Sequence, residues 1–356
     1  MGSTLNRENF TQEASATSHA PLLHAQNRYA VVDLGGTKIA SALATVNTSA
    51  PDALPDLTEI HEIPTPAQDG ADAVIEAVFT AIRHALKNNN DEDGAVNAIG
   101  IASAGVVDTT AGTIISATDL IKGWTGTDVA GRVEAEFGLP VAVLNDVHAH
   151  ALGESRFGAA RNFDSVLAVA VGTGIGGALV LGNEIHMGAH FAAGHVGHVP
   201  HPLASGMPCS CGATGHIESV ASGTGQVMLY NARRRETDPQ ITSGKQLTAA
   251  AQAGEELARR ILIASGAALG DSIAGVANCV DPQAVVLSGS VTRSGEEWWN
   301  ALKAAFTNGA LPAIRKIDIL EGELAGSAPL LGAAVAAHAK ASNINTARTA
   351  GGSNER

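Results

Sequence analysis

One sequence pattern occurs twice in this chain: an apolar strand, a glycine turn and a returning strand. The first copy is Asp33-Leu-Gly-Gly-Thr-Lys-Ile-Ala-Ser-Ala-Leu43, and the second is Ala170-Val-Gly-Thr-Gly-Ile-Gly-Gly-Ala-Leu-Val180. Each copy opens one half of the chain, which indicates two related lobes rather than a solenoid of short repeats. Glycine lets a backbone turn approach an anion without a Cβ clash, so the pair predicts a polyphosphate site, although either turn alone is also typical of a plain hairpin.

Length and composition favour an α/β protein of two domains. The chain has 356 residues, of which 45% are hydrophobic, 16% charged and 3% aromatic, with 40 glycines. A core of this kind is large and aliphatic, and it is joined by many tight turns.

The charge and the cysteine count argue against several classes of partner. A formal net charge of −13 does not favour nucleic acid, which needs a basic surface. We see no apolar run of about 20 residues, and the first 27 residues do not resemble a secretory signal. Three cysteines do not make a disulfide framework. We therefore expect a soluble, cytoplasmic protein with no membrane partner.

Strand-like and helix-like segments alternate between two polar tails, residues 1–27 and 342–356, that we expect to be loose. The patterns predict strands over 29–34, 38–45, 98–103, 140–144, 165–171, 176–181 and 284–287. They predict helices over 71–87, 128–137, 147–157, 217–221, 255–280 and 329–340. We divide the chain into a smaller lobe over 28–141, to which a helix over 326–341 returns, and a larger lobe over 142–325.

Asp146 is the strongest catalytic candidate. It follows the apolar strand 140–144 and precedes a helix, so its carboxylate lies where open α/β sheets place their ligands. Capping that helix is an alternative role. Asn145 beside it can bind a hydroxyl of a sugar. Asp33, at the end of the first strand, either holds Mg²⁺ through water or orders the glycine turn.

A Cys/His cluster forms the most distinctive motif. His198, Cys209, Cys211 and His216 lie within 19 positions and match a tetrahedral zinc site by type and number. Reduced thiols beside scattered histidines are the alternative in a chain with 13 histidines. With four protein ligands the metal would be structural. Glu218 either binds sugar hydroxyls or favours a helix N-terminus, and His195 either contacts the ligand or supports residues that do.

Taken together, these motifs resemble the ROK family of bacterial sugar kinases and sugar-responsive repressors over residues 29–340. The resemblance implies a first phosphate loop with Asp33, Gly35, Gly36, Thr37 and Lys38, and a second with Gly172, Thr173, Gly174 and Gly176. It also implies that Leu144-Asn145-Asp146 is the catalytic motif, with Asp146 as general base. Leu287-Ser-Gly289-Ser290 resembles the family's loop on the adenosine side.

The resemblance further implies a two-lobed actin-like ATPase fold (ribonuclease H-like), each lobe a mixed sheet flanked by helices. It implies transfer of the γ-phosphoryl group of ATP to the 6-hydroxyl of a sugar, with Mg²⁺ and a structural Zn²⁺ as cofactors. ATP and a small-molecule sugar would be the partners, and a homodimer is the family expectation. The implied sugar-binding residues are Gly105, Asp119, Asn145, Asp146, His195, His198 and Glu218.

Three positions depart from the family pattern. His216 replaces a usual cysteine ligand, and Asp119 replaces a sugar-binding asparagine. His195 replaces a glutamate of glucokinase-like members, and Gly194-His195-Val-Gly-His198 is similar to bacterial N-acetylmannosamine kinases. A 2-acetamido group is bulkier than a hydroxyl and forms different hydrogen bonds, so this position favours N-acetylmannosamine as substrate.

Several alternatives stay open at this point. Glucokinase is the main alternative within the enzyme class. A non-catalytic sugar sensor and an actin-like filament protein share the same fold. The repressors of the family carry a DNA-binding helix-turn-helix before the first strand, and the segment before Tyr29 lacks helical periodicity and basic character. The sequence therefore favours a kinase.

Overall fold

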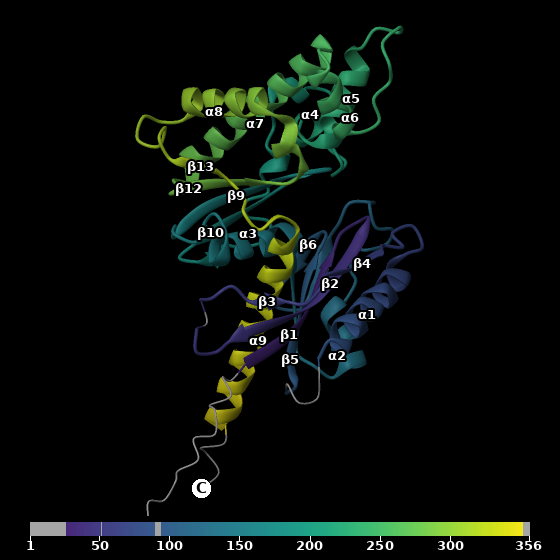
Figure 1. The fold of residues 1–356 in the computed structure, drawn as a ribbon, viewed down its shortest axis with the longest axis vertical. Helices are drawn as coiled ribbons and strands as arrows, with labels where there is room; N and C mark the ends of the chain where they lie inside the picture. The colour runs from purple at the N-terminus through teal and green to yellow at the C-terminus, as the bar shows by residue number, and fades with distance from the viewer. Residues whose placement is uncertain (1–25, 51, 90–93, 352–356) are drawn as a thin grey trace, which may run out of the picture.

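The computed structural model describes residues 26–50, 52–89 and 94–351. The chain folds into two lobes, each built on one mixed β-sheet with helices on both faces (Figure 1). The chain passes from the first lobe to the second after residue 145, and it returns through residues 322–327.

The first sheet has the strand order β3-β2-β1-β5-β8, and β4 also pairs with β2. The strand bounds are β1 Gln26–Leu34, β2 Lys38–Asn47, β3 Asp56–Leu57, β4 His61–Pro64, β5 Val96–Ser103 and β8 Val141–Asn145. β1 and β2 form an antiparallel hairpin, while β1, β5 and β8 run parallel. The carboxyl ends of the three parallel strands therefore share one edge, where Leu34 pairs with Ser103 and Ser103 with Asn145.

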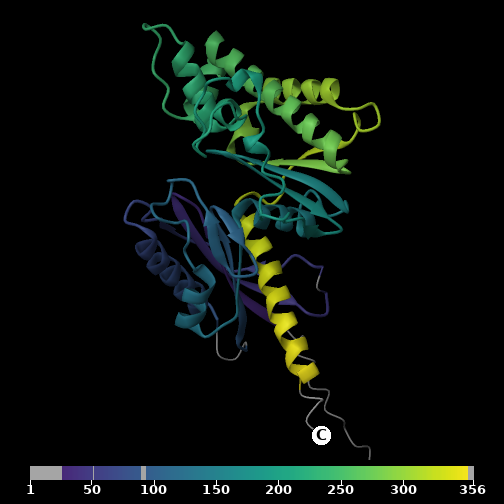
Figure 2. The ribbon, with the colours of Figure 1, turned by 180° about the vertical axis from the view of Figure 1, so that it is seen from behind.

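Helices cover both faces of this sheet. α1 (Ala71–Lys87) and α2 (Val129–Phe137) pack on one face, and a small hairpin of β6 (Val106–Asp108) and β7 (Thr113–Ser116) adjoins the same core. The other face is covered by α9 (Ala328–Gly351), which returns from the second lobe and lies along the sheet (Figure 2). The first lobe is thus completed by the last helix of the chain.

The second sheet has the strand order β11-β10-β9-β12-β13. Its strands are β9 Ser165–Val171, β10 Ile175–Leu181, β11 Glu184–Ile185, β12 Ala284–Ser288 and β13 Asp318–Glu321. β9 and β10 form the second antiparallel hairpin, and β12 runs parallel to β9. The start of the second sheet therefore repeats the hairpin-plus-parallel-strand arrangement of the first, as the repeated sequence pattern predicts.

One face of the second sheet carries a layer of helices around the largest apolar core. These helices are α4 (Glu218–Ala221), α5 (Gly223–Arg233), α6 (Gly244–Gln252), α7 (Glu256–Val280) and α8 (Glu296–Gly309). Short 3₁₀ turns connect the parts, namely η2 (Val196–His198), η3 (Pro202–Ala204), η4 (Ser290–Ser294) and η5 (Ala325–Ser327). The opposite face packs on α3 (Asp146–Phe157).

α3 and α9 pack closely where the two lobes meet. A Cβ atom on Gly332 would lie 1.8 Å from the carbonyl oxygen of Ala149, and one on Gly153 would lie 2.3 Å from that of Ala328. Only glycine allows backbones to approach this closely. The position of α3 is therefore fixed by the helix that completes the first lobe.

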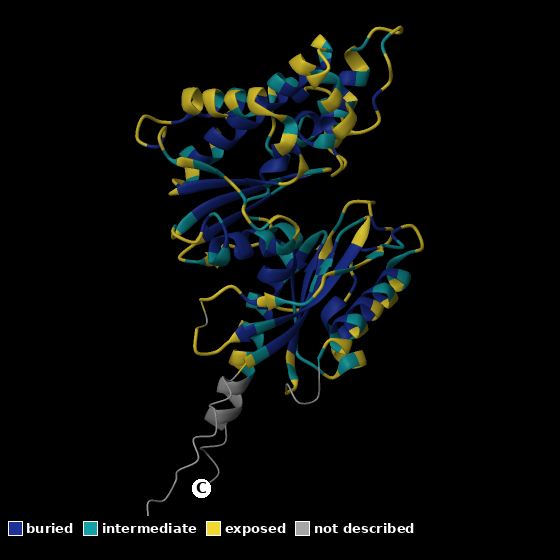
Figure 3. Ribbon diagram, viewed as in Figure 1, coloured by how far each residue is buried: buried dark blue, intermediate teal, exposed yellow. Residues whose placement is uncertain are grey.

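α7 is long and apolar enough to cross a membrane, by length and composition alone. However, 61% of its most apolar stretch is buried inside the protein. Its buried residues include Ile261, Leu269 and Ile273, which pack between the second sheet and α8. Figure 3 shows this buried stretch in dark blue, so α7 is a core helix of the second lobe.

Most predicted elements are present, with corrections at their ends. α3 begins at Asp146 and is capped by Asn145, so the capping role that we considered for Asp146 belongs to its neighbour. β1 includes residues 26 and 27, and α9 continues to Gly351, so parts of the predicted tails are regular structure. Residues 1–25 and 352–356 lie outside the described residues. β8 pairs with β5, so the first sheet extends to residue 145, beyond the boundary at 141 that we give the smaller lobe from the sequence.

Candidate active site

Two aspartates lie at the shared edge of the first sheet. Asp33 is the penultimate residue of β1, and Asp146 directly follows β8. Burial raises the pKa of Asp146 to about 6. Burial, followed by the charge of Asp146, raises the pKa of Asp33 to about 7. The two carboxyl groups are therefore close enough to interact, and both bind protons more tightly than an ordinary aspartate.

Asn145 fixes the start of α3. Its side-chain oxygen accepts the backbone N–H groups of Val147 (3.0 Å) and His148 (3.1 Å). Its amide donates to the carbonyl of Gly105 (2.9 Å) and to Oδ1 of Asp146 (2.7 Å). The asparagine thus caps the helix and orients the catalytic candidate, which leaves Oδ2 of Asp146 for other partners.

The first glycine turn is held by its own hairpin and by the segment after β4. The N–H of Gly35 donates to the carbonyl of Lys38 at 3.0 Å, and the hydroxyl of Thr65 donates to the carbonyl of Gly35 at 2.7 Å. Thr37 and Lys38 are exposed, and Lys38 forms an ion pair with Glu62. Thr37 and Lys38 are therefore accessible to a ligand.

The second glycine turn is held by the start of α5. The N–H of Gly172 donates to the carbonyl of Gly174 at 2.9 Å, and the N–H of Gly223 donates to the carbonyl of Gly172 at 2.8 Å. Thr173 at the tip is exposed. Gly289, with φ of 99°, lies so close to Val171 that a Cβ would meet its carbonyl oxygen at 2.4 Å. Gly289 therefore has to be glycine for β12 to end beside this turn.

Asp146 lies between the two glycine hairpins. It is close to Asp33, which precedes the first turn, through the interaction that raises the pKa of Asp33. Its neighbour Val147 packs on Gly176 of the second hairpin, where a Cβ would lie 2.4 Å from the valine side chain. The start of α3 thus brings the carboxylate near both turns.

A cavity of about 790 Å³ opens beside the second glycine turn. It is formed by that turn, α5, α6 and η4, and its polar lining includes Thr173, Thr224, Ser243, Lys245 and Arg293. This volume lies within the usual range for small-molecule sites. Apart from Gly172, Thr173 and Ser290, the lining residues were not predicted from the sequence. Ser243 and Lys245 lie in a polar stretch without a motif, and only the fold places them beside Gly172.

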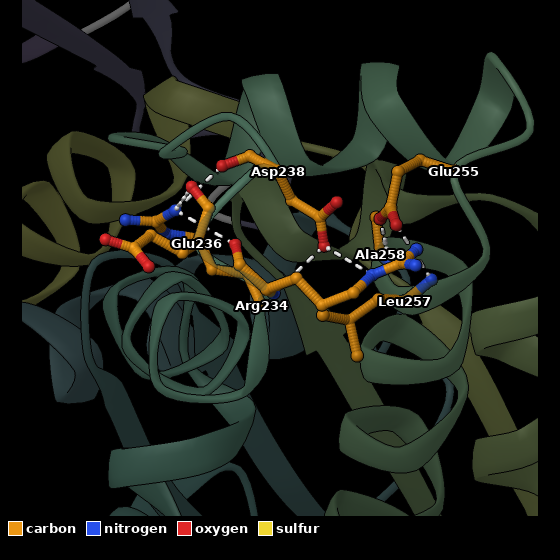
Figure 4. A network of polar contacts seen from close by, with 7 residues as sticks. Arg234, Glu236, Asp238, Glu255, Leu257 and Ala258 are labelled. Carbon is orange, nitrogen blue, oxygen red and sulfur yellow. Dashed lines mark hydrogen bonds and ion pairs between the residues drawn. The ribbon is translucent and has the colours of Figure 1, made fainter.

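The loop that leads into this cavity is held by a polar network (Figure 4). The guanidinium of Arg234 donates to the carbonyl of Asp238 at 2.7 Å, and the carboxylate of Asp238 accepts the N–H of Arg235 at 3.0 Å. Asn231 donates to the carbonyl of Ile241 at 2.6 Å and accepts its N–H at 3.2 Å. These bonds position the start of α6, which lines the cavity.

The predicted Cys/His cluster is assembled. The ligand atoms of His198, Cys209, Cys211 and His216 all lie within 4.8 Å of one another. Sγ of Cys209 lies 3.5 Å from Nδ1 of His198, and Sγ of Cys211 lies 3.3 Å from Nδ1 of His216. A tetrahedral zinc ion separates its sulfur and nitrogen ligands by roughly 3.6 Å. The donor set therefore fits zinc in both composition and spacing.

Glu218 joins this cluster to the second glycine hairpin. One carboxylate oxygen accepts the N–H of Ile175 at 2.9 Å, and the other accepts the hydroxyl of Ser210 and lies 3.7 Å from Sγ of Cys209. Glu218 is also the first residue of α4. The structure thus shows the helix N-terminal position of Glu218, and its carboxylate links the Cys/His loop to the hairpin.

His195 lies on a segment that is seated directly on β10. A Cβ on Gly194 would lie 2.7 Å from Ala178, and one on Gly197 would lie 2.0 Å from the carbonyl oxygen of Ile175. These two glycines bring His195 beside the second hairpin, and its ring stacks with that of His198 at 6.5 Å between centroids. Burial, followed by the charge of His198, lowers the pKa of His195.

The two remaining predicted sugar residues differ in their surroundings. Gly105 contacts Asn145 through its carbonyl and has φ of 97°, so it is part of the site. Asp119 is exposed and has no hydrogen bond or ion pair within the described ranges. The next residue, Leu120, lies against Gly36 of the first glycine turn. The structure therefore brings the loop of Asp119 to the site, without a contact from Asp119 itself.

Comparison with known proteins places this arrangement among sugar kinases. The chain is 30% identical over 296 residues to the glucokinase of Halalkalibacterium halodurans, covering 80% of this chain and 87% of the relative. It is 31% identical over 324 residues to the bifunctional enzyme NanE/NanK of Brucella suis, covering 90% of this chain and 54% of that protein.

A solved ROK-family glucokinase from Streptomyces griseus, in complex with glucose and AMPPNP, is 29% identical. It superposes with a TM-score of 0.73 and covers 88% of this chain and 100% of the other. The two-lobed architecture is the actin-like ATPase fold of the ROK sugar kinases, as expected. The model of the ROK family matches residues 29–340, and the chain therefore belongs to the ROK family.

Proposed function

We propose that this ROK-family sugar kinase transfers the γ-phosphoryl group of ATP to the 6-hydroxyl of N-acetylmannosamine. The observation that carries the proposal is the position of Asp146 between two glycine hairpins, with a nucleotide-sized cavity beside the second hairpin. The choice of sugar rests on His195, which occupies a position where glucokinase-like members of the family have a glutamate.

Asp146 would act as the general base. Its Oδ1 is held by Asn145 and by the N–H of Val147 (2.9 Å), which leaves Oδ2 to accept the proton of the sugar hydroxyl. A pKa of about 6 leaves the carboxylate ionised at neutral pH and still basic enough to accept a proton. Asn145 and Gly105 lie beside it and would help to hold the sugar.

The phosphates would lie between the two glycine turns. The first turn supplies Gly35, Gly36, Thr37 and Lys38, and the second supplies Gly172, Thr173, Gly174 and Gly176. The cavity beside Thr173 would hold the adenosine, with Gly289 at the end of β12. When bound with ATP, Mg²⁺ neutralises phosphate charge, and Asp33 is placed to hold it through water. Phosphoryl transfer depends mainly on such positioning and electrostatics.

The Cys/His cluster would hold one structural zinc ion. Its four protein donors fill a tetrahedral shell, so a bound ion braces the loop rather than activating water. Glu218 connects this loop to the second hairpin, and His195 precedes the ligand His198 by three residues. The loop geometry on which sugar binding depends would therefore rely on the metal.

His195 would select the sugar. A glutamate at this position accepts hydrogen bonds from sugar hydroxyls, whereas a neutral imidazole offers one donor and one acceptor and carries no charge. Because burial lowers its pKa, His195 is uncharged at neutral pH. The ring therefore favours a sugar with an amide at C2 over one with a hydroxyl there.

Glucokinase is the second candidate, and the glucokinases among the relatives favour it. A coupled ADP-release assay with Mg-ATP should compare kcat/KM for N-acetylmannosamine, N-acetylglucosamine, glucose and mannose. We expect N-acetylmannosamine to be preferred. A preference for glucose would identify a glucokinase, and absence of turnover with every sugar would favour a sensor of the same fold. Size-exclusion chromatography would test the expected homodimer.

A further inference from the structure

His148 is a buried histidine that the proposed reaction does not use. It lies in the first turn of α3, two residues after Asp146, and its side chain is only 1% exposed. Its Nε2 is buried without a hydrogen-bond partner among the described residues. An unpaired polar atom in the interior is costly, so a residue of this kind requires an explanation.

The ring of His148 packs against the ring of His195. The centroids are 5.8 Å apart and the planes meet at 88°, which is the edge-to-face arrangement that aromatic pairs prefer. His195 also stacks with His198, with planes at 16°. His195 is therefore held between a residue of the catalytic helix and a residue of the Cys/His loop.

Both rings of this pair are uncharged near neutral pH. Burial lowers the pKa of His148 to about 4 and also lowers that of His195. The backbone of Ala193 bonds to both rings and that of Ala192 to the ring of His195, while Nδ1 of His195 is buried without a hydrogen-bond partner among the described residues. Backbone groups therefore contact both rings, and the edge-to-face contact with His148 is a further restraint on the ring of His195.

We propose that His148 is a positioning residue that sets the ring orientation of His195 for recognition of the sugar. This inference rests on the proposed function, because it assumes that His195 contacts the sugar. α3 also packs on β10 through Val147 and Gly176, and the segment of His195 is seated on the same strand. β10 is thus a common platform, on which Asp146 and His195 are kept in a fixed relation through His148.

The test is a double-mutant cycle of His148→Ala and His195→Ala, measured as the Kd of the preferred sugar by calorimetry and as kcat/KM. We expect His148→Ala to weaken sugar binding about 3- to 10-fold, the range typical of an edge-to-face ring pair, while the KM for ATP stays unchanged. In the His195→Ala background the same change should have little further effect. His148→Phe keeps the ring and should restore most of the binding.

A matched control is His150→Ala, which removes a half-buried histidine from the same helix, two residues further on. It should leave the Kd of the sugar unchanged. Equal effects of His148→Ala in both backgrounds, or an effect shared by His150→Ala, would overturn the proposal.

The ring signals of His195 in ¹⁵N NMR spectra provide a readout that needs no activity. They should shift in His148→Ala and return towards the wild-type positions in His148→Phe. Unchanged His195 signals in His148→Ala would also overturn the positioning role. If the NMR result holds while the enzyme prefers glucose or is inactive, the positioning role stands and the proposed function fails.

Discussion

At the scale of single residues, the sequence leaves open whether Asp146 caps a helix, and the structure assigns the cap to Asn145. The residue before an α-helix and the first residue within it both follow a strand, and either can cap. Asn145 takes the cap with two N–H bonds, which frees Asp146 for chemistry. Sequence alone does not settle which residue caps the helix, because the answer changes if the helix begins one residue earlier or later.

We predict that Asp146→Asn lowers kcat by about 100-fold or more and leaves the Kd of the sugar within about 3-fold, since general-base catalysis contributes roughly 10²–10⁴-fold. Steady-state kinetics and sugar titration provide the measurement. Asp128→Asn is the matched control, because Asp128 caps α2 by accepting the N–H of Gly131 and asparagine caps equally well. Near-normal turnover of Asp146→Asn would rule out the general-base role.

The pH dependence follows from the raised pKa of Asp146. Its ordinary value is 3.8 and its value here is about 6, so the protonated, inactive form accumulates as the pH falls below 6. We predict that kcat/KM decreases about tenfold per pH unit on that limb. The same shift makes the folded state bind the proton more tightly, so its contribution to stability decreases as the pH rises from about 4 to 6. A kcat/KM profile that is flat from pH 5 to 8 would contradict this assignment.

At the scale of elements, the strands, the glycine turns and most helices follow from apolar periodicity and glycine spacing. α1 extends over the predicted range, and β9 does so too. Of the cavity beside Thr173, the sequence motifs include only Gly172, Thr173 and Ser290. Its other walls come from α5, α6 and η4, which are remote from the glycine turn in sequence. Thr242 and Lys245 belong to no recognisable sequence motif, so only the packing of the fold shows that they line the cavity.

The Cys/His loop gives a prediction at this scale. Protein purified without chelator should contain about one zinc ion per chain by elemental analysis, because the four donors fit a tetrahedral shell. Cys209→Ser should lose most of this zinc and raise the KM for the sugar more than the KM for ATP. Cys279→Ser is the matched control, since Cys279 is exposed and lies on α7. Equal zinc content in the two variants would contradict the site.

At the scale of the whole molecule, the two lobes are joined around α3. The buried carboxylate of Glu154 accepts the N–H groups of Ala159 (2.9 Å), Glu323 (3.1 Å) and Leu324 (2.9 Å). Glu323 and Leu324 belong to the segment that crosses back to the first lobe. Glu154 therefore links α3, where the chain first enters the second lobe, to the segment that returns to the first lobe.

We predict that Glu154→Gln lowers the free energy of unfolding by about 1–3 kcal/mol, because an amide replaces a buried carboxylate that accepts three N–H groups. Urea denaturation is the measurement. Glu323→Gln is the control in the same segment. Its carboxylate is 56% exposed and pairs with Arg161, so its loss should cost less than about 1 kcal/mol. Equal effects would show that Glu154 does not tie the crossing segment.

The return of α9 to the first sheet has a consequence for biosynthesis. The last strand of that sheet leaves the ribosome with residue 145, while the helix that covers its second face begins at residue 328. Translation proceeds at roughly 5–20 residues per second. The apolar face of the sheet, which includes Tyr29, Val31 and Ala98, therefore stays uncovered for about 10–40 seconds. During that interval the nascent first lobe exposes a surface that chaperones recognise, and truncation within α9 would leave it exposed permanently.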